Sequence, residues 1–249
     1  MAKTLILIPS RMSATRLPGK PLLKINNLSI ISHVFKRAKE ANIGEVVVAT
    51  EDQEILKDVL KNGGKAILTQ KDHKTGTDRI FEAYKKLNIK NIDYILNLQG
   101  DEPNINKDDI INLNNLMINN KSEIGTSAAI IQNHEMLNNK NVVKVITESK
   151  LEENSFPEAL NFTRENLSKK NINIYHHIGI YSYKVNILEK FVSLDQTKNE
   201  KKNKLEQLRA LDNKLKINVS LAKSSPIGVD TEEDYLAIKK IMEYKLQNE

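Results

Sequence analysis

The stretch KTLILIPSRMSATRLPGKP, residues 3–21, decides the fold prediction, because a run of aliphatic residues leads directly into a basic loop. The continuous apolar run Leu5–Ile8 is typical of a strand that is buried on both faces of a parallel sheet. Ser10–Pro21 contains Gly19 and two prolines, which predict a loop. In open α/β sheets, the loops that follow the carboxyl ends of the strands line the ligand crevice. We therefore expect this loop to border a binding site.

The same loop carries positive charge among small residues. Arg11, Arg16 and Lys20 can offset the charge of a ligand, and small residues let backbone N–H groups approach phosphate oxygens. The chain has six arginines against 32 lysines, so two arginines in one loop favour bidentate binding of phosphate or carboxylate. The P-loop pattern G-x-x-x-x-G-K-[ST] is absent. A basic surface turn remains the alternative interpretation of this segment.

Outward from this stretch, strand-like and helix-like segments alternate through the first half of the chain. Short apolar runs predict strands, and apolar residues at helical spacing predict helices. The predicted strands are 3–9, 45–50, 66–69 and 94–98, and the predicted helices are 30–41, 53–62, 77–87 and 108–119. This alternation predicts right-handed βαβ units and a parallel sheet.

The second half is less regular. Strands are predicted at 124–131, 142–147, 174–183 and 217–222, and helices at 187–192, 204–211 and 234–246. The segment 150–173 has no clear period and is expected to protrude, and the charged run 198–204 is expected to be a solvated helix start or loop. Thr231 and Asp234 form the pattern of a capping box. We expect one Rossmann-like α/β domain, 1–249, in which roughly 150–212 contribute a lid or dimerisation lobe.

The composition excludes several classes of protein. The length of 249 residues and the 39% hydrophobic content suit one large domain, and the absence of cysteine excludes disulfides, thiolate metal sites and cysteine nucleophiles. No apolar run approaches the roughly 20 residues of a spanning helix, so we expect a cytoplasmic protein without membrane insertion. The net charge of +6 is spread along the chain, and only 5% of residues are aromatic, which argues against nucleic acid as a partner.

Two acidic segments could hold a divalent cation. Asp101 follows an apolar strand and Gly100, and carboxylates combined with substrate phosphates are ligands that suit Mg²⁺. The alternative for Asp101 is an ordinary turn. Asp230 precedes the last predicted helix, where a carboxylate often serves only as a cap or a partner of the helix dipole. The metal interpretation therefore requires that both aspartates meet at one ion.

Two further segments carry weaker signals. His176 and His177 are adjacent on a predicted strand and are expected to point to opposite faces, so a metal site built on both is not expected. Glu206–Arg209 lies on a predicted helix, where an ordinary solvated face is the simpler interpretation.

Taken together and in order, these segments resemble the 3-deoxy-manno-octulosonate (KDO) cytidylyltransferases, also called CMP-KDO synthetases. The resemblance covers nearly the whole chain. The matching motifs are Ile8–Pro21, with Ser10 where the family has Ala, then Ala49-Thr50, Thr75–Arg79, Asn97–Pro103, Val143–Val145, His177–Tyr181, Leu205–Arg209 and Val229-Asp230. The first motif recurs in sugar-nucleotide transferases generally, whereas H-x-G-[IV]-Y followed by L-E-Q-L-R is specific.

The resemblance implies a nucleotidyltransferase fold with a mostly parallel central sheet and a smaller dimerisation or lid lobe, assembled as a homodimer. It implies that CTP and an octulosonate sugar acid react, with Mg²⁺ as cofactor, to give a CMP-sugar and pyrophosphate for lipopolysaccharide biosynthesis. The implied nucleotide-binding residues are Arg11, Ser13, Arg16, Lys20, Arg79 and Asp101. The implied catalytic residues are Arg11, Lys20, Asp101 and Asp230, of which Asp101 and Asp230 would hold the metal. The implied sugar-acid pocket consists of Gln99, Arg164, His177, Tyr181, Glu206 and Gln207.

Two departures from the family pattern leave the sugar acid open. Thr163–Ser168 lacks the proline of the family's S-R-x-x-I-P around Arg164, and Lys198–Asn203 replaces P-L-E-x-x-E. Both lie in the lobe expected to shape the sugar pocket or the dimer. KDO, an 8-amino analogue of KDO and a sialic-acid-like substrate therefore stay as alternatives. A non-catalytic nucleotide-binding module is the remaining alternative, and the two aspartates argue against it because binding alone needs no metal-positioned α-phosphate.

Overall fold

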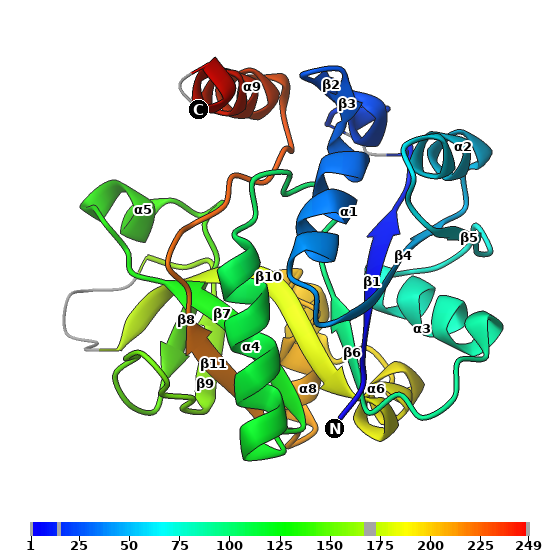
Figure 1. The fold of residues 1–249 in the computed structure, drawn as a ribbon. Coiled ribbons are helices and arrows are strands. Elements are labelled where there is room, and N and C mark those ends of the chain that lie inside the picture. The colour runs from blue at the N-terminus through cyan, green and yellow to red at the C-terminus, as the bar shows by residue number, and fades with distance from the viewer. Residues whose placement is uncertain (1, 14–15, 167–172, 248–249) are drawn as a thin grey trace.

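The computed structural model describes residues 2–13, 16–166 and 173–247, and within them nine strands form one twisted sheet (Figure 1). The strand order is β11-β7-β10-β6-β1-β4-β5. The bounds are β1 Thr4–Ser10, β4 Gly44–Thr50, β5 Ala66–Leu68, β6 Tyr94–Asn97, β7 Ile124–Ala129, β10 Ile174–Lys184 and β11 Ile217–Leu221. β1, β4, β5 and β6 are parallel, as are β7 and β11. The predicted α/β fold with a mostly parallel sheet is confirmed.

β10 is the antiparallel member at the centre of this sheet. It pairs with β6 on one side and with β7 on the other, and its register shifts between Ile178 and Tyr181. Its first residues also pair with β8 (Lys144–Thr147), which pairs in turn with β9 (Ala159–Thr163). The second half of the chain therefore adds a small antiparallel extension, formed by β8, β9 and the start of β10, beside the main sheet.

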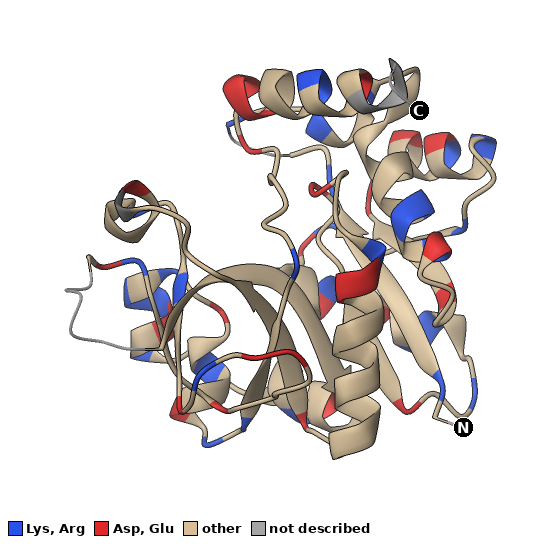
Figure 2. Ribbon diagram, turned by 60° about the vertical axis from the view of Figure 1, so that its left-hand side comes forward, with Lys and Arg blue, Asp and Glu red and all other residues tan. Residues whose placement is uncertain are grey.

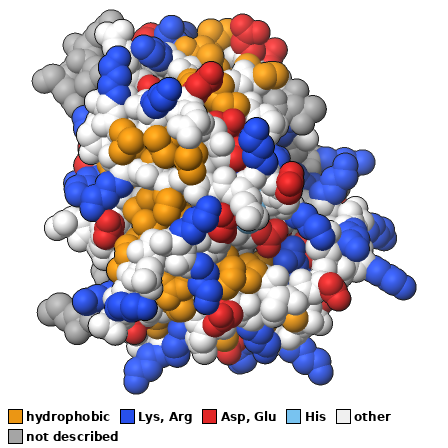
Figure 3. Space-filling model, turned by 90° about the vertical axis from the view of Figure 1, so that its right-hand side faces the viewer, with side chains coloured by type: hydrophobic (Ala, Val, Ile, Leu, Met, Phe, Trp, Pro, Cys, Tyr) orange, Lys and Arg blue, Asp and Glu red, His pale blue; other side chains and the backbone are white. Residues whose placement is uncertain are grey.

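Helices cover both faces of the sheet because the strands are apolar on both faces. Leu5 and Leu7 pack in one core cluster, with α3 (Gly76–Leu87), α6 (Val185–Ser193) and α8 (Leu208–Asp212). Ile6 and Ile8 pack in the other, with α1 (Ile30–Glu40), α2 (Gln53–Lys61) and α4 (Lys107–Asn120). Charged residues lie on the helices and loops, whereas the strands are almost free of them (Figure 2). On the face shown in Figure 3, basic side chains are interspersed with acidic and apolar ones.

The C-terminal segment returns to the loop that follows β1. A short helix, η1 (Lys20–Leu22), leads into the hairpin of β2 (Lys24–Ile25) and β3 (Leu28–Ser29), whose turn residues Asn26 and Asn27 have φ of 50° and 64°. Helix α9 (Glu232–Gln247) packs on this hairpin through a small apolar cluster, and the hydroxyl of Tyr235 donates to the carbonyl of Lys24 at 2.7 Å. This packing brings the start of α9 beside the first loop.

Most predicted elements are present, and three segments of the second half differ in detail from the prediction. The expected protruding segment 150–173 contains β9, which is only five residues long and pairs at the edge of the extension. The expected helix 204–211 begins only at Leu208, and Lys204, with a φ of 53°, instead ends the preceding helix. The charged run forms the helix α7 (Lys198–Asn203), which was one of the two expected alternatives, but its Glu200 is only 4% exposed.

Smaller features complete the comparison. The hairpin β2–β3 and helix α5 (His134–Asn138) were not predicted, since both are too short to show a period. The capping box of α9 is confirmed: Thr231 N donates to Asp234 Oδ2 at 2.9 Å, and Asp234 N donates to Thr231 Oγ1 at 3.2 Å.

Candidate active site

A cavity of about 360 Å³ lies at the carboxyl ends of β1 and β6. Its walls are the loop after β1, the turn that precedes α3, the turn after β6 and the start of α9. The lining residues include Arg11, Arg16, Lys20, His73, Lys74, Gly76, Arg79, Gln99, Asp101 and Asp230. The basic loop therefore borders a cavity, as its position after the first strand predicts.

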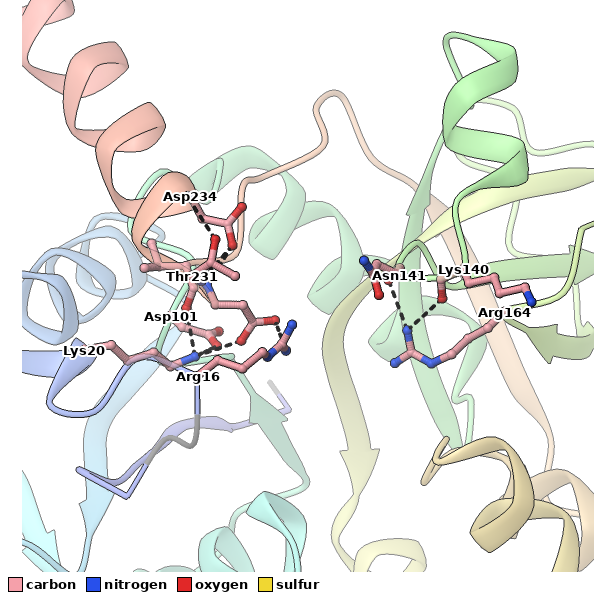
Figure 4. A network of polar contacts seen from close by, with 10 residues as sticks. Arg16, Lys20, Asp101, Lys140, Asn141, Arg164, Thr231 and Asp234 are labelled. Carbon is pink, nitrogen blue, oxygen red and sulfur yellow. Dashed lines mark hydrogen bonds and ion pairs between the residues drawn. The ribbon is translucent and has the colours of Figure 1, made fainter.

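The ammonium of Lys20, a residue that lines this cavity, lies between two carboxylates (Figure 4). Lys20 Nζ is 2.7 Å from Asp101 Oδ2 and 3.1 Å from Asp230 Oδ1, and it also donates to the carbonyl of Val229 at 2.8 Å. Arg16 Nη2 pairs with the other oxygen of Asp230 at 2.7 Å. Burial by itself lowers the pKa of Lys20, but Asp101 and then Asp230 outweigh it, and the pKa is raised. The two aspartates thus converge on one cation.

Backbone contacts explain why these aspartates meet. A Cβ on Gly100 would lie 2.7 Å from the carbonyl oxygen of Pro9, so only glycine lets the turn after β6 approach β1 this closely. The N–H of Val229 donates to the carbonyl of Asp101 at 2.9 Å, which fixes the segment before α9 against that turn. Asp230 is therefore held near Asp101, because the residue before it, Val229, is hydrogen-bonded to the backbone of Asp101.

A second hollow, of about 380 Å³, continues from the first and shares Gln99, Asp101 and Asp230 with it. Its lining includes all six residues predicted for the sugar-acid pocket, namely Gln99, Arg164, His177, Tyr181, Glu206 and Gln207. The structure thus brings together side chains from β10, from the turns that follow β6 and β9, and from the turn that precedes α8, which are far apart in the sequence.

Buried polar atoms that lack a hydrogen bond gather in this second hollow. Within the described residues, Asn97 Oδ1, Glu102 Oε2 and Tyr181 Oη form no hydrogen bond, Glu206 Oε1 has only an ion pair with Arg209 Nη2 at 3.6 Å, and all four residues line the hollow. Burial, followed by the charge of Asp101, raises the pKa of Glu102 to about 8. Such atoms suit a ligand that carries several hydroxyl groups, because each buried polar group gains from a partner.

Gln99 and the histidines are held by specific contacts. Gln99 Nε2 donates to the carbonyl of Gly179 at 2.9 Å, at the irregular point of β10. His177 Nε2 lies 3.1 Å from Thr126 Oγ1, and His176 Nδ1 lies 3.2 Å from Ser225 Oγ. The two imidazoles bind different elements, yet both border the second hollow, which corrects the expectation that only one could face a pocket. Burial, followed by the charges of His176 and Arg164, lowers the pKa of His177 to about 3.

Two of the residues expected to bind the nucleotide, Arg79 and Ser13, have surroundings that the sequence did not predict. Arg79 borders the first cavity but is only 2% exposed, and its guanidinium binds Glu51, Thr69 Oγ1 at 2.7 Å and the carbonyl of Gln70 at 3.2 Å. Its charge is therefore already neutralised by Glu51. Ser13 is exposed and, among the described residues, is not part of the lining of either hollow. Arg11 is exposed at the rim of the first cavity.

Several lining residues were not singled out from the sequence. His73 borders the first cavity and is held by a hydrogen bond to Glu82, and Asn97 and Glu102 face the second hollow. Asn97 and Glu102 flank Gln99–Asp101 on the same strand end and turn, so proximity to those residues is the signal that could have found them. His73 gives no such signal, because its loop has no periodic pattern.

Comparison with known proteins agrees with this geometry. A family model described as cytidylyltransferase matches residues 5–217. The 3-deoxy-manno-octulosonate cytidylyltransferase of Rhodopseudomonas palustris (strain BisB18) is 44% identical over 241 residues, which cover 96% of this chain and 98% of that protein. The chain belongs to the 3-deoxy-manno-octulosonate cytidylyltransferase family. The member from Thermodesulfovibrio yellowstonii is also 44% identical, over 96% of this chain and 98% of its own.

Solved structures give the same result for this member of the cytidylyltransferase family. The structure of CMP:2-keto-3-deoxy-manno-octonic acid synthetase complexed with CTP matches 98% of this chain and 100% of its own, with a TM-score of 0.89 and 33% identity. UDP-glucose pyrophosphorylase complexed with UDP-glucose matches with a TM-score of 0.73 at 18% identity, which shows a shared fold alone. Among the described residues, no helix is long and apolar enough to cross a membrane.

Proposed function

We propose that this chain transfers CMP from CTP to the anomeric hydroxyl of KDO and releases pyrophosphate. The observation that carries the proposal is that two hollows, one basic and one lined with buried polar atoms that lack a hydrogen bond, meet at Asp101 and Asp230. A nucleotide in the first and a sugar acid in the second would bring their reacting atoms to this junction. The named activity of the relatives and the CTP complex of the similar structure support the same assignment.

The first cavity is the proposed nucleotide end. Arg11, Arg16 and Lys20 would hold the triphosphate, since they bring cations to a cavity whose other wall is a glycine-containing turn. We keep Ser13 as a proposed contact from the same loop. Arg79, whose guanidinium binds Glu51, would act by shaping the wall next to the nucleotide rather than by supplying free charge.

Asp101 and Asp230 fit a magnesium ion. Both carboxylates already lie within 3.1 Å of a single ammonium nitrogen, and Mg²⁺ usually takes one or two protein carboxylates together with substrate phosphates. No cluster of three or more histidine or acidic side chains able to hold a metal occurs among the described residues, so phosphate oxygens would have to complete the shell. When bound, Mg²⁺ supplies Lewis-acid activation of the α-phosphate and neutralises phosphate charge.

The second hollow is the proposed sugar-acid end. Arg164 extends into the cleft from the side opposite Lys20, and a guanidinium suits a planar carboxylate (Figure 4). His177 and Tyr181 would contact the sugar from β10. Gln99 would contact it from the turn after β6, and Glu206 and Gln207 from the turn before α8. His177 would contact the sugar as a neutral imidazole, because its pKa is about 3.

The reaction is an in-line substitution at phosphorus. The anomeric oxygen of the sugar forms a bond to the α-phosphorus, the bond between that phosphorus and the oxygen of the β-phosphate breaks, and the hydroxyl proton leaves to solvent. Both substrates are anions, so Arg11, Arg16 and Lys20 offset their repulsion and stabilise the charge that develops on pyrophosphate. Holding the two substrates in adjoining hollows aligns the attacking oxygen with the phosphorus. No covalent enzyme intermediate is required.

Three wider assignments accompany this function. The product is expected to serve lipopolysaccharide biosynthesis in the cytoplasm, where CTP is made. The whole chain is proposed to act as one nucleotidyltransferase domain in which roughly 150–212 form the sugar-binding and dimerisation lobe. A homodimer through this lobe is supported by Leu160 of β9, which is 61% exposed on a strand that pairs in the sheet only with β8 among the described residues. Light scattering after size-exclusion chromatography tests the dimer.

A pyrophosphate-release assay with purified protein tests the function. We expect release only when CTP, KDO and Mg²⁺ are present together, and none after chelation with EDTA. The same assay with 8-amino-KDO and a sialic acid at fixed CTP identifies the sugar acid, since a higher kcat/KM for either would replace KDO in the proposal. Calorimetry that detects CTP binding without turnover of any of the three acids would instead favour a non-catalytic nucleotide-binding module.

A further inference from the structure

Lys144 is a buried cation that the proposed reaction does not yet use. It starts β8, its exposed fraction is 0%, and it is among the largest fully buried side chains of the molecule. Lysine is almost never fully buried without an acidic partner. Yet Lys144 forms no ion pair with any residue that the structure describes, in contrast to Lys20, which has two aspartates.

The ammonium of Lys144 is satisfied by two backbone carbonyls. Lys144 Nζ donates to the carbonyl of Asn139 at 2.8 Å and to the carbonyl of Arg164 at 3.4 Å. In the ladder of β8 with β9, Lys144 lies opposite Thr163, the residue that precedes Arg164. Lys144 therefore ties the backbone of Arg164 to the loop that follows α5.

The side chain of Arg164 binds the same loop from the other side. Arg164 Nη1 donates to the carbonyl of Asn141 at 3.0 Å and to the carbonyl of Lys140 at 3.4 Å (Figure 4). Three consecutive carbonyls, those of Asn139, Lys140 and Asn141, thus accept from two cations. Nε and Nη2 of Arg164 make no hydrogen bond to the described residues, and Arg164 and Asn141 both line the second hollow.

The corner formed by these two side chains has positive charge without a counter-charge. Within the described residues, neither Lys144 nor Arg164 forms an ion pair. His176 lies opposite Lys144 on β10, and burial and then the charge of Lys144 lower its pKa, so this imidazole is neutral at pH 7. An anionic group of a ligand would supply the missing charge, with its two oxygens on the unused donors of Arg164.

We propose that Lys144 is the positioning residue for the carboxylate of the sugar acid. It holds the backbone of Arg164 and the loop Asn139–Asn141 so that the free edge of the guanidinium faces the second hollow, and its buried charge strengthens anion binding there. The inference rests on the proposed function, because that function supplies the carboxylate.

The test compares Lys144→Met with wild type in the pyrophosphate-release assay, with KDO and CTP varied separately. Methionine has nearly the length of lysine and removes both the charge and the donors. We expect the KM for KDO to rise about ten-fold, whereas the KM for CTP changes by less than about two-fold. Lys144→Gln, which keeps a donor without the charge, is the second variant and is used if Lys144→Met does not fold.

Two controls separate positioning from a purely structural role. Thr147→Val on the same strand removes one buried hydrogen bond, from Thr147 Oγ1 to the carbonyl of Ser149 at 2.7 Å, and is expected to lower the melting temperature without changing the KM for KDO. In an Arg164→Ala background, Lys144→Met should raise the KM for KDO by less than about two-fold, because the partner through which it acts is gone.

The outcomes are distinguishable. An unchanged KM for KDO in Lys144→Met, a parallel rise of both KM values, or an additive effect in the Arg164→Ala background overturns the positioning role and leaves the proposed function standing. A wild-type protein that releases no pyrophosphate from CTP with KDO overturns the proposed function, and the positioning role with it.

Discussion

Glu200→Gln tests the buried ion pair between Glu200 and Arg209, which lies beside the second hollow. The carboxylate of Glu200 is 4% exposed and accepts from Arg209 Nε at 2.9 Å and from Arg209 Nη2 at 2.6 Å. Arg209 is 3% exposed and lies 3.6 Å from Glu206 and 4.8 Å from the ring centre of Phe191. Glutamine would leave the guanidinium buried with the more distant Glu206 as its nearest counter-charge.

The expected loss follows from this geometry. Removing one partner of a buried pair costs about 3–5 kcal/mol, and the remaining contact with Glu206 places the loss near the lower value. At about 2–4 °C per kcal/mol for a chain of this size, the melting temperature should fall by about 6–12 °C. Differential scanning calorimetry measures the change.

The matched control is Glu189→Gln on α6. Glu189 pairs with Lys85 at 3.3 Å, and both side chains are about 60% exposed, so the control should cost less than about 1 kcal/mol. Adding Arg209→Met to Glu200→Gln should recover at least half of the lost stability, because the stranded charge is removed. A melting temperature for Glu200→Gln within 2 °C of the control, or no recovery in the double variant, would refute the reasoning.

Three further predictions concern the cleft. Asp101→Asn should reduce kcat by about 10³-fold while the circular dichroism spectrum stays native. The control Asp108→Asn, which removes an exposed ion pair with Lys223, should retain the wild-type kcat. Near-normal turnover by the Asp101→Asn variant would remove Asp101 from the mechanism. Between pH 6.5 and about 3, His177 is protonated in the unfolded chain but neutral in the folded chain, so the free energy of unfolding should fall with decreasing pH by up to about 1.4 kcal/mol per pH unit. His177→Asn should flatten that part of the dependence of stability on pH. A proton NMR signal of His177 that titrates near pH 6.5 would contradict the prediction. Gly100→Ala should lower both stability and turnover because its Cβ would meet the Pro9 carbonyl oxygen at 2.7 Å, while Gly228→Ala, whose Cβ meets nothing within 4 Å, should do neither; equal behaviour of the two variants would argue against a close approach at Gly100.

The strands of the main sheet could be predicted because their continuous apolar runs indicate burial on both faces. Leu5 and Leu7 go to one cluster and Ile6 and Ile8 to the other, as a continuous apolar run requires. The direction of β10 could not be predicted, since an apolar run has the same pattern in either orientation. β9 escaped prediction because it has only five residues and exposes one of its large apolar side chains, Leu160.

The candidate site was predictable as a set of residues, and less so as a set of contacts. The position of Asp101 and Arg11 at the ends of strands placed them at the ligand edge of the sheet. That Asp230 lies beside Asp101 depends on the hydrogen bond from Val229 and on the packing of α9, which leave no local pattern. The neutralisation of Arg79 by Glu51 likewise joins residues from different loops.

The buried pair of Glu200 and Arg209 shows why charge runs mislead. Five of the seven residues from Lys198 to Lys204 are charged, which indicates solvent exposure, yet the helix they form turns its one glutamate inward onto an arginine of α8. A one-dimensional pattern cannot distinguish an acidic residue that faces water from one that is matched by a distant cation.

The central place of β10 has a consequence for how the protein is made. The edges of β6 and β7 that pair with β10 stay open until the ribosome has synthesised residues 174–184, and the other edge of β7 stays open until β11 follows. At about 5–20 residues per second, that interval lasts on the order of ten seconds. A premature stop anywhere before Lys184 would leave this gap permanently, which predicts that such fragments aggregate or are degraded instead of persisting as a folded first half.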